Sequence, residues 1–361
     1  MPSALDGIRV LDLTRLLPGA MATQYLADFG AEVIKIEQPG VGDYARTLFT
    51  PTGENPVFAA TNRGKRSVEL DLKTEDGRDT LTRLARNADV LIESFRPGVM
   101  DRLQLGYDTL RTENPRLIYA SLTGYGQDGA MRDAAGHDLN YLAMSGALDL
   151  NGEADQPPAV PNLQIADLAG GAMQAALGIL LALVARERTG MGQFVDVSMT
   201  RGSAAMLTIA FAQLAATQRG ITRGEGILSG AYACYSVYRC RDGRFIAVGA
   251  LEPKFWNTLC TALEREDLIP RHYASQSEQA KLKSELAATF ERRESADWIR
   301  ELGSLDCCVT LVRTIEEAAA CDWLRPDEPA PRLSATPGVR ATSAPRLGEH
   351  THEILIKEQS A

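Results

Sequence analysis

The sequence lacks the cysteine and histidine patterns that mark metal sites and secreted disulfide frameworks. Its 361 residues include six cysteines and four histidines, with no CxxC pair and no Cys/His spacing of the zinc-binding kind. His272, His350 and His352 are expected on the surface or in the tail, and the last two have no further ligands beside them for a metal. In a chain of this length we expect the cysteines to be reduced thiols.

Positive charge is in the minority. The chain carries 38 Lys and Arg against 47 Asp and Glu, for a formal net charge of −9 and a pI of about 5.2. This balance argues against nucleic acid as the main partner, although a local cluster of basic residues can still bind an anionic ligand. The N-terminal segment has no basic region followed by an apolar core, so it predicts no secretory signal. We expect a cytoplasmic protein.

Long hydrophobic runs are rare, and only one raises the question of a membrane. Residues 168–184 are uncharged and interrupted only by Gln174. This length is close to the lower limit for a spanning helix. Because the run contains three glycines and follows directly on Asp167, we interpret it as a buried core helix and expect no membrane partner.

The first predicted strand–helix turn, LTRLLPGA, has no GxGxxG, which disfavours a dinucleotide site of the usual kind. The pattern around it is nonetheless regular. Strands predicted at 8–13, 32–37, 89–93, 117–122 and 194–199 alternate with helices predicted at 20–29, 75–87 and 107–113 and with the apolar helix after Asp167. Such alternation predicts an α/β fold with an open, mostly parallel sheet covered by helices on both faces.

Composition also indicates the domain boundaries. Residues 1–218 form the predicted large domain, and the glycine-rich segment 219–230 reads as a linker. A smaller α+β domain follows at 231–324, beginning with a hairpin whose turn contains Asp242-Gly243. Residues 325–361 form a C-terminal arm, proline-rich as far as 348. No internal repeats, heptads or low-complexity tracts appear.

Three titratable residues stand at turns or element boundaries flanked by apolar sequence: His137, Asp167 and Glu252. An imidazole and a carboxylate on opposite sides of a carbon can remove a proton from one face and return it to the other. Each residue also has a purely structural interpretation. His137 can simply begin a helix predicted at 138–148, Asp167 can cap the apolar helix, and Glu252 can precede a helix that begins with Pro253.

The helix ends bear on the chemistry of these groups. Positive partial charge at a helix N-terminus disfavours imidazolium, so we expect His137 to stay neutral near neutral pH. The same charge favours the Asp167 carboxylate, whereas burial opposes it. We therefore expect the two residues to share one proton and titrate as a coupled pair. Backbone N–H groups at the start of the helix after Asp167 are expected to stabilise an enolate oxygen.

Several segments together resemble one known family. IRVLDLTRLLPG and LADFGAEVIKIEQP, NRGKRSVELDLK, ADVLIESFRPGVMDRLQLGYDTL, LIYASLTGYGQDG, TGMGQFVDVSM and DGRFIAVGALEPKFW are similar to the family III CoA-transferases, the superfamily that includes the α-methylacyl-CoA racemases. The resemblance covers nearly the whole chain. It implies a Rossmann-like large domain, a small domain, and a tail that returns to the large domain. It also implies an interlocked homodimer whose active sites lie between one subunit's large domain and the partner's small domain.

Two chemistries occur in that superfamily. Transferases use the aspartate that matches Asp167 as a nucleophile, whereas racemases pair it with a histidine and move the α-proton. His137 in GHDLNY and Glu252 in GALEPKF match the racemase pattern, in which the glutamate supports the histidine. The resemblance thus implies an acyl-CoA racemase of fatty acid and lipid metabolism, acting on 2-methyl-branched acyl-CoA with no cofactor besides the CoA of the substrate. A CoA-transferase is the first alternative, and a non-catalytic CoA-binding protein is the second.

The sequence departs from the family at three places. Gln38 stands where a basic residue often contacts the nucleotide, Ala130 replaces a frequent proline, and Leu168-Ala169 interrupts a glycine-rich stretch. The acyl group is expected to meet apolar residues such as Met144, Leu228 and Tyr232. The predicted CoA-binding residues are Leu16, Ala60, Arg63, Lys65, Arg66, Leu72, Lys73, Phe95, Arg96, Arg102, Gly136, Asp138 and Tyr141, and the basic ones among them are candidates for the phosphates.

Overall fold

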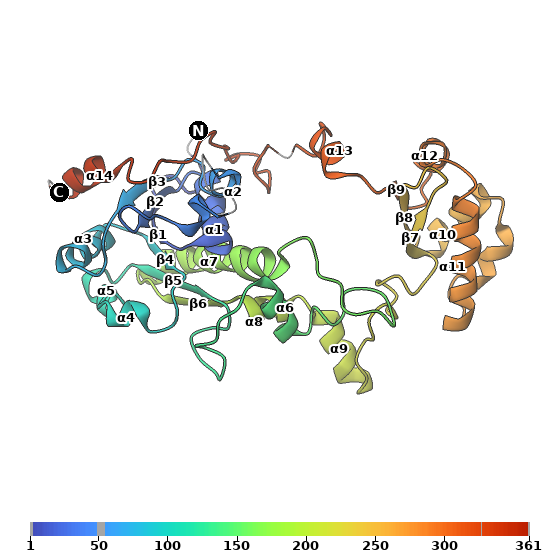
Figure 1. Ribbon diagram of the computed structural model, residues 1–361, viewed down its shortest axis with the longest axis horizontal. Helices are drawn as coiled ribbons and strands as arrows, with labels where there is room; N and C mark the ends of the chain where they lie inside the picture. Colours follow the sequence, from blue (N-terminus) through green and yellow to red (C-terminus); the bar gives the residue numbers. More distant parts are fainter. Residues whose placement is uncertain (1–2, 49–54, 326, 360–361) are drawn as a thin grey trace. The chain divides into compact units, whose positions relative to one another are not determined.

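The computed structural model describes residues 3–48, 55–325 and 327–359, which separate into two compact units (Figure 1). Unit 1 takes in the described residues of Met1–Ala147, Pro161–Thr208 and Pro326–Ala361, and unit 2 takes in Leu148–Val160 and Ile209–Arg325. Nearly all of helix α9 (Thr208–Thr217), which we assigned to the large domain, therefore lies in unit 2.

Unit 1 is built on a six-stranded sheet in the order β3-β2-β1-β4-β5-β6, and every pairing in it is parallel. This confirms the predicted α/β fold. The central strand β1 lies between β2 and β4, with Leu11 opposite both Ile34 and Leu91. The strands are β1 (Arg9–Leu13), β2 (Glu32–Glu37), β3 (Arg66–Glu69), β4 (Val90–Glu93), β5 (Ile118–Thr123) and β6 (Phe194–Ser198).

Helices cover both faces of this sheet (Figure 1). On one face the apolar side chains of α3 (Glu75–Arg86), α5 (Tyr107–Glu113) and α14 (Thr351–Gln359) share a core with those of the strands. On the other face α1 (Leu16–Asp28) packs against α7 (Met173–Thr189), which also contacts β5 and β6. The shorter helices of unit 1 are η1 (Tyr44–Arg46), α2 (Pro56–Thr61), α4 (Val99–Arg102), α6 (Asp138–Ser145) and α8 (Met199–Ala205).

Strand β2 is buried more completely than its sequence predicts. EVIKIE contains three charged residues, yet five of its six residues are buried, and Lys35 is fully so. A parallel strand covered on both faces has no solvent-facing side. Lys35 is tolerated there because its ammonium lies 2.9 Å from Oδ2 of Asp43 and donates to the carbonyl of Thr14.

The edge strand β3 was missed in the sequence because it is only four residues long and is preceded by charged residues. The C-terminal arm lies along it. The His350 N–H donates to the carbonyl of Ser67 (2.9 Å), and the Gly348 N–H donates to the Ser67 hydroxyl (2.9 Å). Covering an exposed strand edge in this way satisfies backbone groups that would otherwise remain open to pairing with another chain.

The apolar helix of the sequence extends over Ala166–Thr189 and combines a π-helical segment, η2 (Ala166–Ala172), with α7. It is long and apolar enough to span a membrane, with 44% of its most apolar window buried. One face packs on the sheet, so the expected core helix is only half buried. The other face is exposed and presents Met173, Leu177, Leu180, Leu181 and Val184.

Unit 2 contains an antiparallel sheet in the order β7-β8-β9, packed on helices around a core that includes Trp256, Phe290 and Trp298. The predicted hairpin is confirmed, with Asp242-Gly243 in the turn between β7 (Tyr235–Arg239) and β8 (Phe245–Gly249). The short strand β9 (Val309–Leu311) was not predicted. The helices are α10 (Pro253–Ala262), η3 (Glu266–Arg271), α11 (Gln276–Phe290), α12 (Ser295–Leu302) and α13 (Ile315–Ala319).

His272 corrects a sequence prediction. We expected a surface residue, but the side chain is only 6% exposed. Its ring stacks between those of Trp256 and Tyr273, and Nε2 lies 3.2 Å from the carbonyl oxygen of Ala250. The polar sequence around it gave no sign of this stacking, because Trp256 lies on a different helix.

Candidate active site

An open pocket of about 590 Å³ lies in unit 1 at the carboxyl ends of the central strands. Residues 15–18 follow β1, residues 94–97 follow β4 and residues 124–125 follow β5, and all of them line it. In doubly wound parallel sheets, ligands bind at this edge, where the strand order reverses direction. Here the reversal falls between β1 and β4. His137 and Asp167 both line this pocket, so the structure brings these two predicted residues together.

Asp167 lies inside the first turn of η2, not before it, so the N-cap interpretation is wrong. The backbone N–H of Asp167 instead donates to Oδ1 of Asp138, at 2.9 Å. Asp138 thus supplies the acceptor that the helix start needs, and the Asp167 side chain is left to face the pocket. Single turns of π-helix inserted in longer helices are frequent at functional sites.

The Asp167 carboxyl is held in an environment that resists ionisation. Burial, and after it the negative charge of Asp138, raise the pKa of Asp167 to about 7. The positive end of the helix, which favours a carboxylate, is outweighed. Near neutral pH this group therefore exists in both protonation states, as a group that must act as acid in one direction and as base in the other requires.

His137 begins helix α6, as predicted, although that helix ends at Ser145 and not near residue 148. Its N–H donates to Oδ1 of Asn140 (3.0 Å), and its carbonyl accepts from the N–H groups of Asn140 and Tyr141. These bonds fix the backbone at the helix start, while the side chain is exposed at the pocket.

The residues around this pair are tightly connected. Asp138, next to His137, accepts from Asp167, and the Tyr141 hydroxyl donates to the carbonyl of Gly136. Burial and the neighbouring Asp167 and Tyr125 raise the pKa of Tyr141 to about 12, so its phenol stays protonated.

Two of the backbone N–H groups that we expected as enolate donors at the start of the helix are already engaged. The Asp167 N–H donates to Asp138, and the Leu168 N–H donates to the carbonyl of Gln164 at 2.9 Å. A buried N–H that is satisfied within the protein does not stabilise an oxyanion without first losing that partner.

Glu252 belongs to unit 2, whereas His137 and Asp167 belong to unit 1. It stands at the N-cap of α10, and Pro253 occupies the first helical position, as predicted. Its carbonyl accepts from the N–H groups of Phe255 and Trp256. The side chain is exposed.

Comparison with known proteins identifies the family. The sequence model described as CoA-transferase family III matches residues 5–351. The chain belongs to this family. It is 40% identical over 367 residues to the α-methylacyl-CoA racemase of Homo sapiens, which covers 98% of this chain and 92% of that protein. It is also 34% identical over 389 residues to an acyl-CoA transferase of Fusarium pseudograminearum, covering 98% and 84%.

A solved structure of a CAIB/BAIF family protein from Brucella suis has the same fold. It superposes with a TM-score of 0.88 at 29% identity and covers 99% of this chain and 100% of that one. The resemblance seen in the sequence is thereby confirmed at the level of family and fold. Both racemases and transferases of family III are close relatives.

Only some of the predicted CoA-binding residues of this family III protein line the pocket. Leu16, Phe95, Arg96, Gly136 and Tyr141 line the pocket. Ala60, Leu72, Lys73 and Arg102 do not line it, and Leu72 instead packs against the core of unit 1. Asp138 does not line the pocket either, but its carboxylate accepts a hydrogen bond from the backbone N–H of Asp167, which does.

Three predicted phosphate ligands have protein partners instead. Arg63 lies 3.4 Å from the carboxylate of Asp28, and Arg66 pairs with both Glu32 and Glu353. Lys65 is only 3% exposed, and its ammonium donates to Asp12, Thr23, Asn62 and the carbonyl of Ala20. Of the three, Lys65 is thus plainly structural, because a buried ammonium with four acceptors has no donor left for a phosphate.

Two arginines at the pocket were missed. The Arg15 guanidinium lies over the rings of Tyr44 and Phe95, 5.0 and 5.2 Å from their centroids. Arg132 lines the pocket, and its guanidinium group and that of Arg102 both lie close to Gly98. Convergence of guanidinium groups favours phosphate binding.

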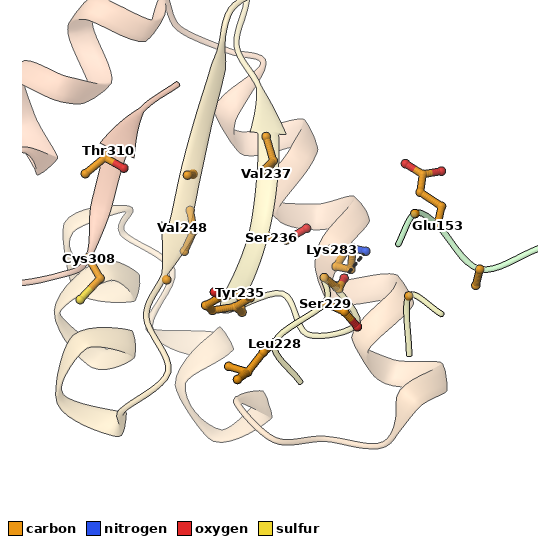
Figure 2. Close-up of a pocket in the computed structure, with 16 residues that line it drawn as sticks. Glu153, Leu228, Ser229, Tyr235, Ser236, Val237, Val248, Lys283, Cys308 and Thr310 are labelled. Carbon is orange, nitrogen blue, oxygen red and sulfur yellow. Dashed lines mark hydrogen bonds between the residues drawn. The ribbon is translucent and has the colours of Figure 1, made fainter. Parts of the chain in front are cut away.

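Unit 2 contains a second pocket, of about 850 Å³, against the sheet β7-β8-β9 (Figure 2). Leu228, one of the predicted acyl-binding residues, lines it together with Tyr235 and Val237. Lys283 also lines it, but its ammonium donates to the carbonyl of Gly230 (2.6 Å). Met144 lies on α6 in unit 1 and is 56% exposed. In the described residues, no group of three or more His, Cys, Asp and Glu side chains is arranged to hold a metal ion.

Proposed function

We propose that this protein is an acyl-CoA racemase that inverts the α-carbon of 2-methyl-branched acyl-CoA thioesters. The observation that carries the proposal is the placement of His137 and Asp167 on one pocket, with the pKa of Asp167 raised to about 7 by burial and Asp138. A racemase needs one group that holds a proton and one that accepts it, with the roles exchanged in the reverse direction.

In one direction His137 removes the α-proton, and the electron pair of the C–H bond moves onto the thioester oxygen to form an enolate. The Asp167 carboxyl then gives its proton to the opposite face of the α-carbon. The enolate electrons form the new C–H bond, which leaves an imidazolium and a carboxylate. In the other direction the two residues exchange roles. No metal, flavin or nicotinamide is required.

The arginines at the pocket suit a CoA thioester. Arg15, Arg96 and Arg132 line the pocket, and the guanidinium groups of Arg102 and Arg132 both lie close to Gly98. We propose that these guanidinium groups hold the phosphates of CoA, in place of the buried Lys65 and the paired Arg63 and Arg66. Bidentate bonds from planar guanidinium groups suit phosphate oxygens.

We further propose that two chains form a homodimer in which Glu252 of one subunit orients His137 of the other. One observation supports this. Helix α7 presents an exposed apolar face of the kind that usually marks an interface.

A CoA-transferase is the second candidate, because Asp167 also faces an open pocket and a close relative is named as an acyl-CoA transferase. In that reaction the Asp167 carboxylate attacks the thioester carbonyl and displaces CoA as its thiolate. A carboxyl that is half protonated near neutral pH is a poorer nucleophile than a fully ionised one, which favours the racemase.

The deciding experiment is α-proton exchange in deuterated water with a 2-methylacyl-CoA and no acceptor acid. Incorporation of deuterium and loss of optical purity are expected for the wild-type protein, and His137→Ala and Asp167→Asn should abolish racemisation. Treatment with hydroxylamine in the presence of acyl-CoA provides the contrast. Modification of Asp167 together with no deuterium incorporation would replace the racemase with the transferase.

A further inference from the structure

Leu16 has an unfavourable backbone conformation at the pocket wall. Its φ is +62°, in the left-handed region that a branched side chain rarely adopts. Leu16 is the first residue of α1 and lines the pocket beside Arg15, Leu17 and Pro18. Strained residues persist only where the surrounding structure holds them, and they concentrate at functional sites.

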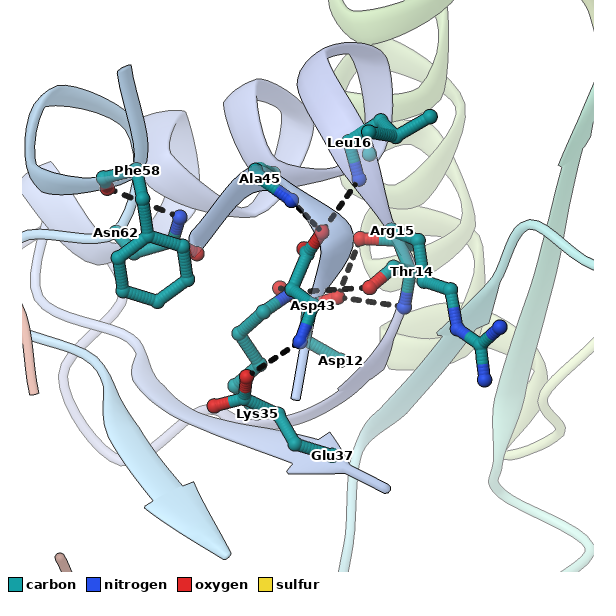
Figure 3. A network of polar contacts seen from close by, with 12 residues as sticks. Asp12, Thr14, Arg15, Leu16, Lys35, Glu37, Asp43, Ala45, Phe58 and Asn62 are labelled. Carbon is teal, nitrogen blue, oxygen red and sulfur yellow. Dashed lines mark hydrogen bonds and ion pairs between the residues drawn. The ribbon is translucent and has the colours of Figure 1, made fainter. Parts of the chain in front are cut away.

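The turn Thr14–Arg15–Leu16 is held by four side chains from outside it, those of Asp12, Lys35 and Asp43 (Figure 3) and that of Ser94. The Thr14 N–H donates to Asp12 Oδ1 (2.9 Å), and the Thr14 carbonyl accepts from the Lys35 ammonium (2.9 Å). The Arg15 N–H donates to the Ser94 hydroxyl (3.0 Å). The Leu16 N–H donates to Asp43 Oδ1 (3.0 Å).

Two of these side chains form a buried ion pair. Lys35 is fully buried and Asp43 is 2% exposed, with Nζ 2.9 Å from Oδ2. Burial by itself would lower the pKa of Lys35, but the carboxylates of Asp12, Asp43 and Glu37 outweigh it and raise that pKa, so the ammonium stays charged. Asp43 also accepts from the N–H of Ala45, another residue of the pocket wall.

We propose that Asp43, held by Lys35, is a positioning residue for the CoA thioester. It keeps the turn after β1 in the left-handed conformation that forms the pocket wall before the ligand arrives. The inference rests on the proposed function in one respect, namely that the pocket binds acyl-CoA. Because this part of the pocket wall is already ordered in the free protein, binding does not include the entropic cost of ordering it. The chemical step is unchanged.

A double-mutant cycle tests this. Asp43→Asn keeps the oxygen that accepts from Leu16 but removes the charge that holds it against Lys35. We expect the KM for acyl-CoA and the Kd for free CoA to rise about tenfold and kcat to change less than about twofold. Leu16→Gly removes the penalty of a positive φ. In that background Asp43→Asn should raise KM and Kd only about threefold or less, because glycine needs no external force to adopt the turn.

Asp89→Asn is the matched control. It breaks another largely buried ion pair, with Arg186 at 2.8 Å, at the opposite end of the strands. It should lower stability but leave KM and Kd unchanged. Ser94→Ala, which removes the acceptor for the Arg15 N–H without touching the ion pair, is the second variant and should show the same suppression by Leu16→Gly.

An Asp43→Asn effect of equal size in both backgrounds, or a loss of kcat with unchanged KM and Kd, would overturn the inference. If Asp43→Asn does not fold, the Ser94→Ala cycle decides by the same criterion. Wild-type protein that binds free CoA without catalysing exchange would overturn the racemase, and the Kd comparison would still decide the role of Asp43. Wild-type protein with no affinity for CoA would overturn both.

Discussion

At the scale of single residues, the environment of Asp167 lowers the stability of the fold and also raises the pKa of this carboxyl to the range that the proposed reaction needs. Its pKa of about 7 in the folded protein exceeds the value of about 3.9 expected for an unfolded aspartate. The fold therefore penalises the carboxylate, and this penalty is complete above pH 7 and disappears as the pH falls towards 4.

Asp167→Asn should consequently stabilise the protein while abolishing racemisation. The gain in unfolding free energy should be on the order of 1–2 kcal/mol at pH 8, less than the full shift implies because the group is partly solvated. It should shrink steadily between pH 7 and pH 4. Denaturant titrations at pH 4, 6 and 8 measure it, and a gain that does not vary with pH would contradict the stated environment of Asp167.

A substitution at Asp138 tests whether its negative charge contributes to the raised pKa of Asp167. Asp138→Asn keeps Oδ1 as acceptor for the Asp167 N–H but removes the negative charge beside it. The pKa of Asp167 should fall, although burial, the larger cause, keeps it above the usual range. The limb of the pH profile of kcat/KM that reports Asp167 should move to lower pH with little change in maximal rate. No displacement would mean that another group sets that limb.

The roles of some of these residues could be predicted from the sequence, whereas the roles of others could not, for a physical reason. His137 and Asp167 were recognisable because each stands at an element boundary and matches a family motif. The roles of Arg63, Lys65 and Arg66 were not, because their partners lie far along the chain. Lys65 meets Asp12 at a separation of 53 residues. A basic residue in a sequence looks the same whether it faces solvent or a buried carboxylate.

At the scale of elements, α14 packs on the core of unit 1 through Ile354, which is buried, and Leu355, which is partly buried. Ile354 is 4% exposed, whereas Ile356 on the same helix is 47% exposed. Ile354→Ala should lower the unfolding free energy by about 3 kcal/mol through lost burial and a cavity. Ile356→Ala, the matched control, should cost less than about 1 kcal/mol. Equal losses, measured by denaturant unfolding, would show that α14 does not pack as described.

The exposed face of α7 should be an interface between two chains. Leu181 is 61% exposed and Val184 is 55% exposed. Replacing both with lysine should convert the proposed dimer to a monomer, because two buried ammonium groups without partners are costly at an interface. Light scattering during size-exclusion chromatography measures the mass. Ile315→Lys, at a residue of unit 2 that is 78% exposed, is the control and should leave the mass unchanged. A monomeric wild-type protein would refute the proposal.

Element prediction succeeded where the local pattern was long or carried a turn signal. The strands β1, β2, β4, β5 and β6 of unit 1 and the hairpin around Asp242-Gly243 are of this kind. It failed for β3 (RSVE) and β9 (VTL), which are no longer than β4 (VLIE) and lack its run of three apolar residues. Strands so short are specified by the neighbours they pair with, which a single sequence does not show.

At the scale of the whole molecule, the proposed dimer predicts complementation. His137→Ala and Glu252→Ala chains should each be inactive alone. Co-expressed, about half of the dimers are heterodimers with one intact site, so activity should reach about a quarter of wild type if the sites are independent. Recovery no greater than the residual activity of the two variants, with heterodimers proven by tagging, would remove Glu252 from the partner's site.

The family and the α/β fold of the whole molecule were predictable, because motifs spread along nearly all of the chain carry them. The division into units was less so. Residues 148–160 belong to unit 2 although sequence from unit 1 flanks them on both sides. Such an excursion is specified by contacts between distant segments, for example the bond from Arg223 to the carbonyl of Asp149.

The return of the C-terminal arm has a consequence for biosynthesis. Ile354 and the bonds from residues 348 and 350 to β3 complete unit 1, yet they follow all of unit 2 in the chain. At roughly 5–20 residues per second, the ribosome needs about 7–28 s to make the roughly 140 residues that separate them from the rest of that unit. During that interval the edge of β3 is unpaired and the core position of Ile354 is empty in the nascent unit 1. These two places form a defined surface that chaperones can bind.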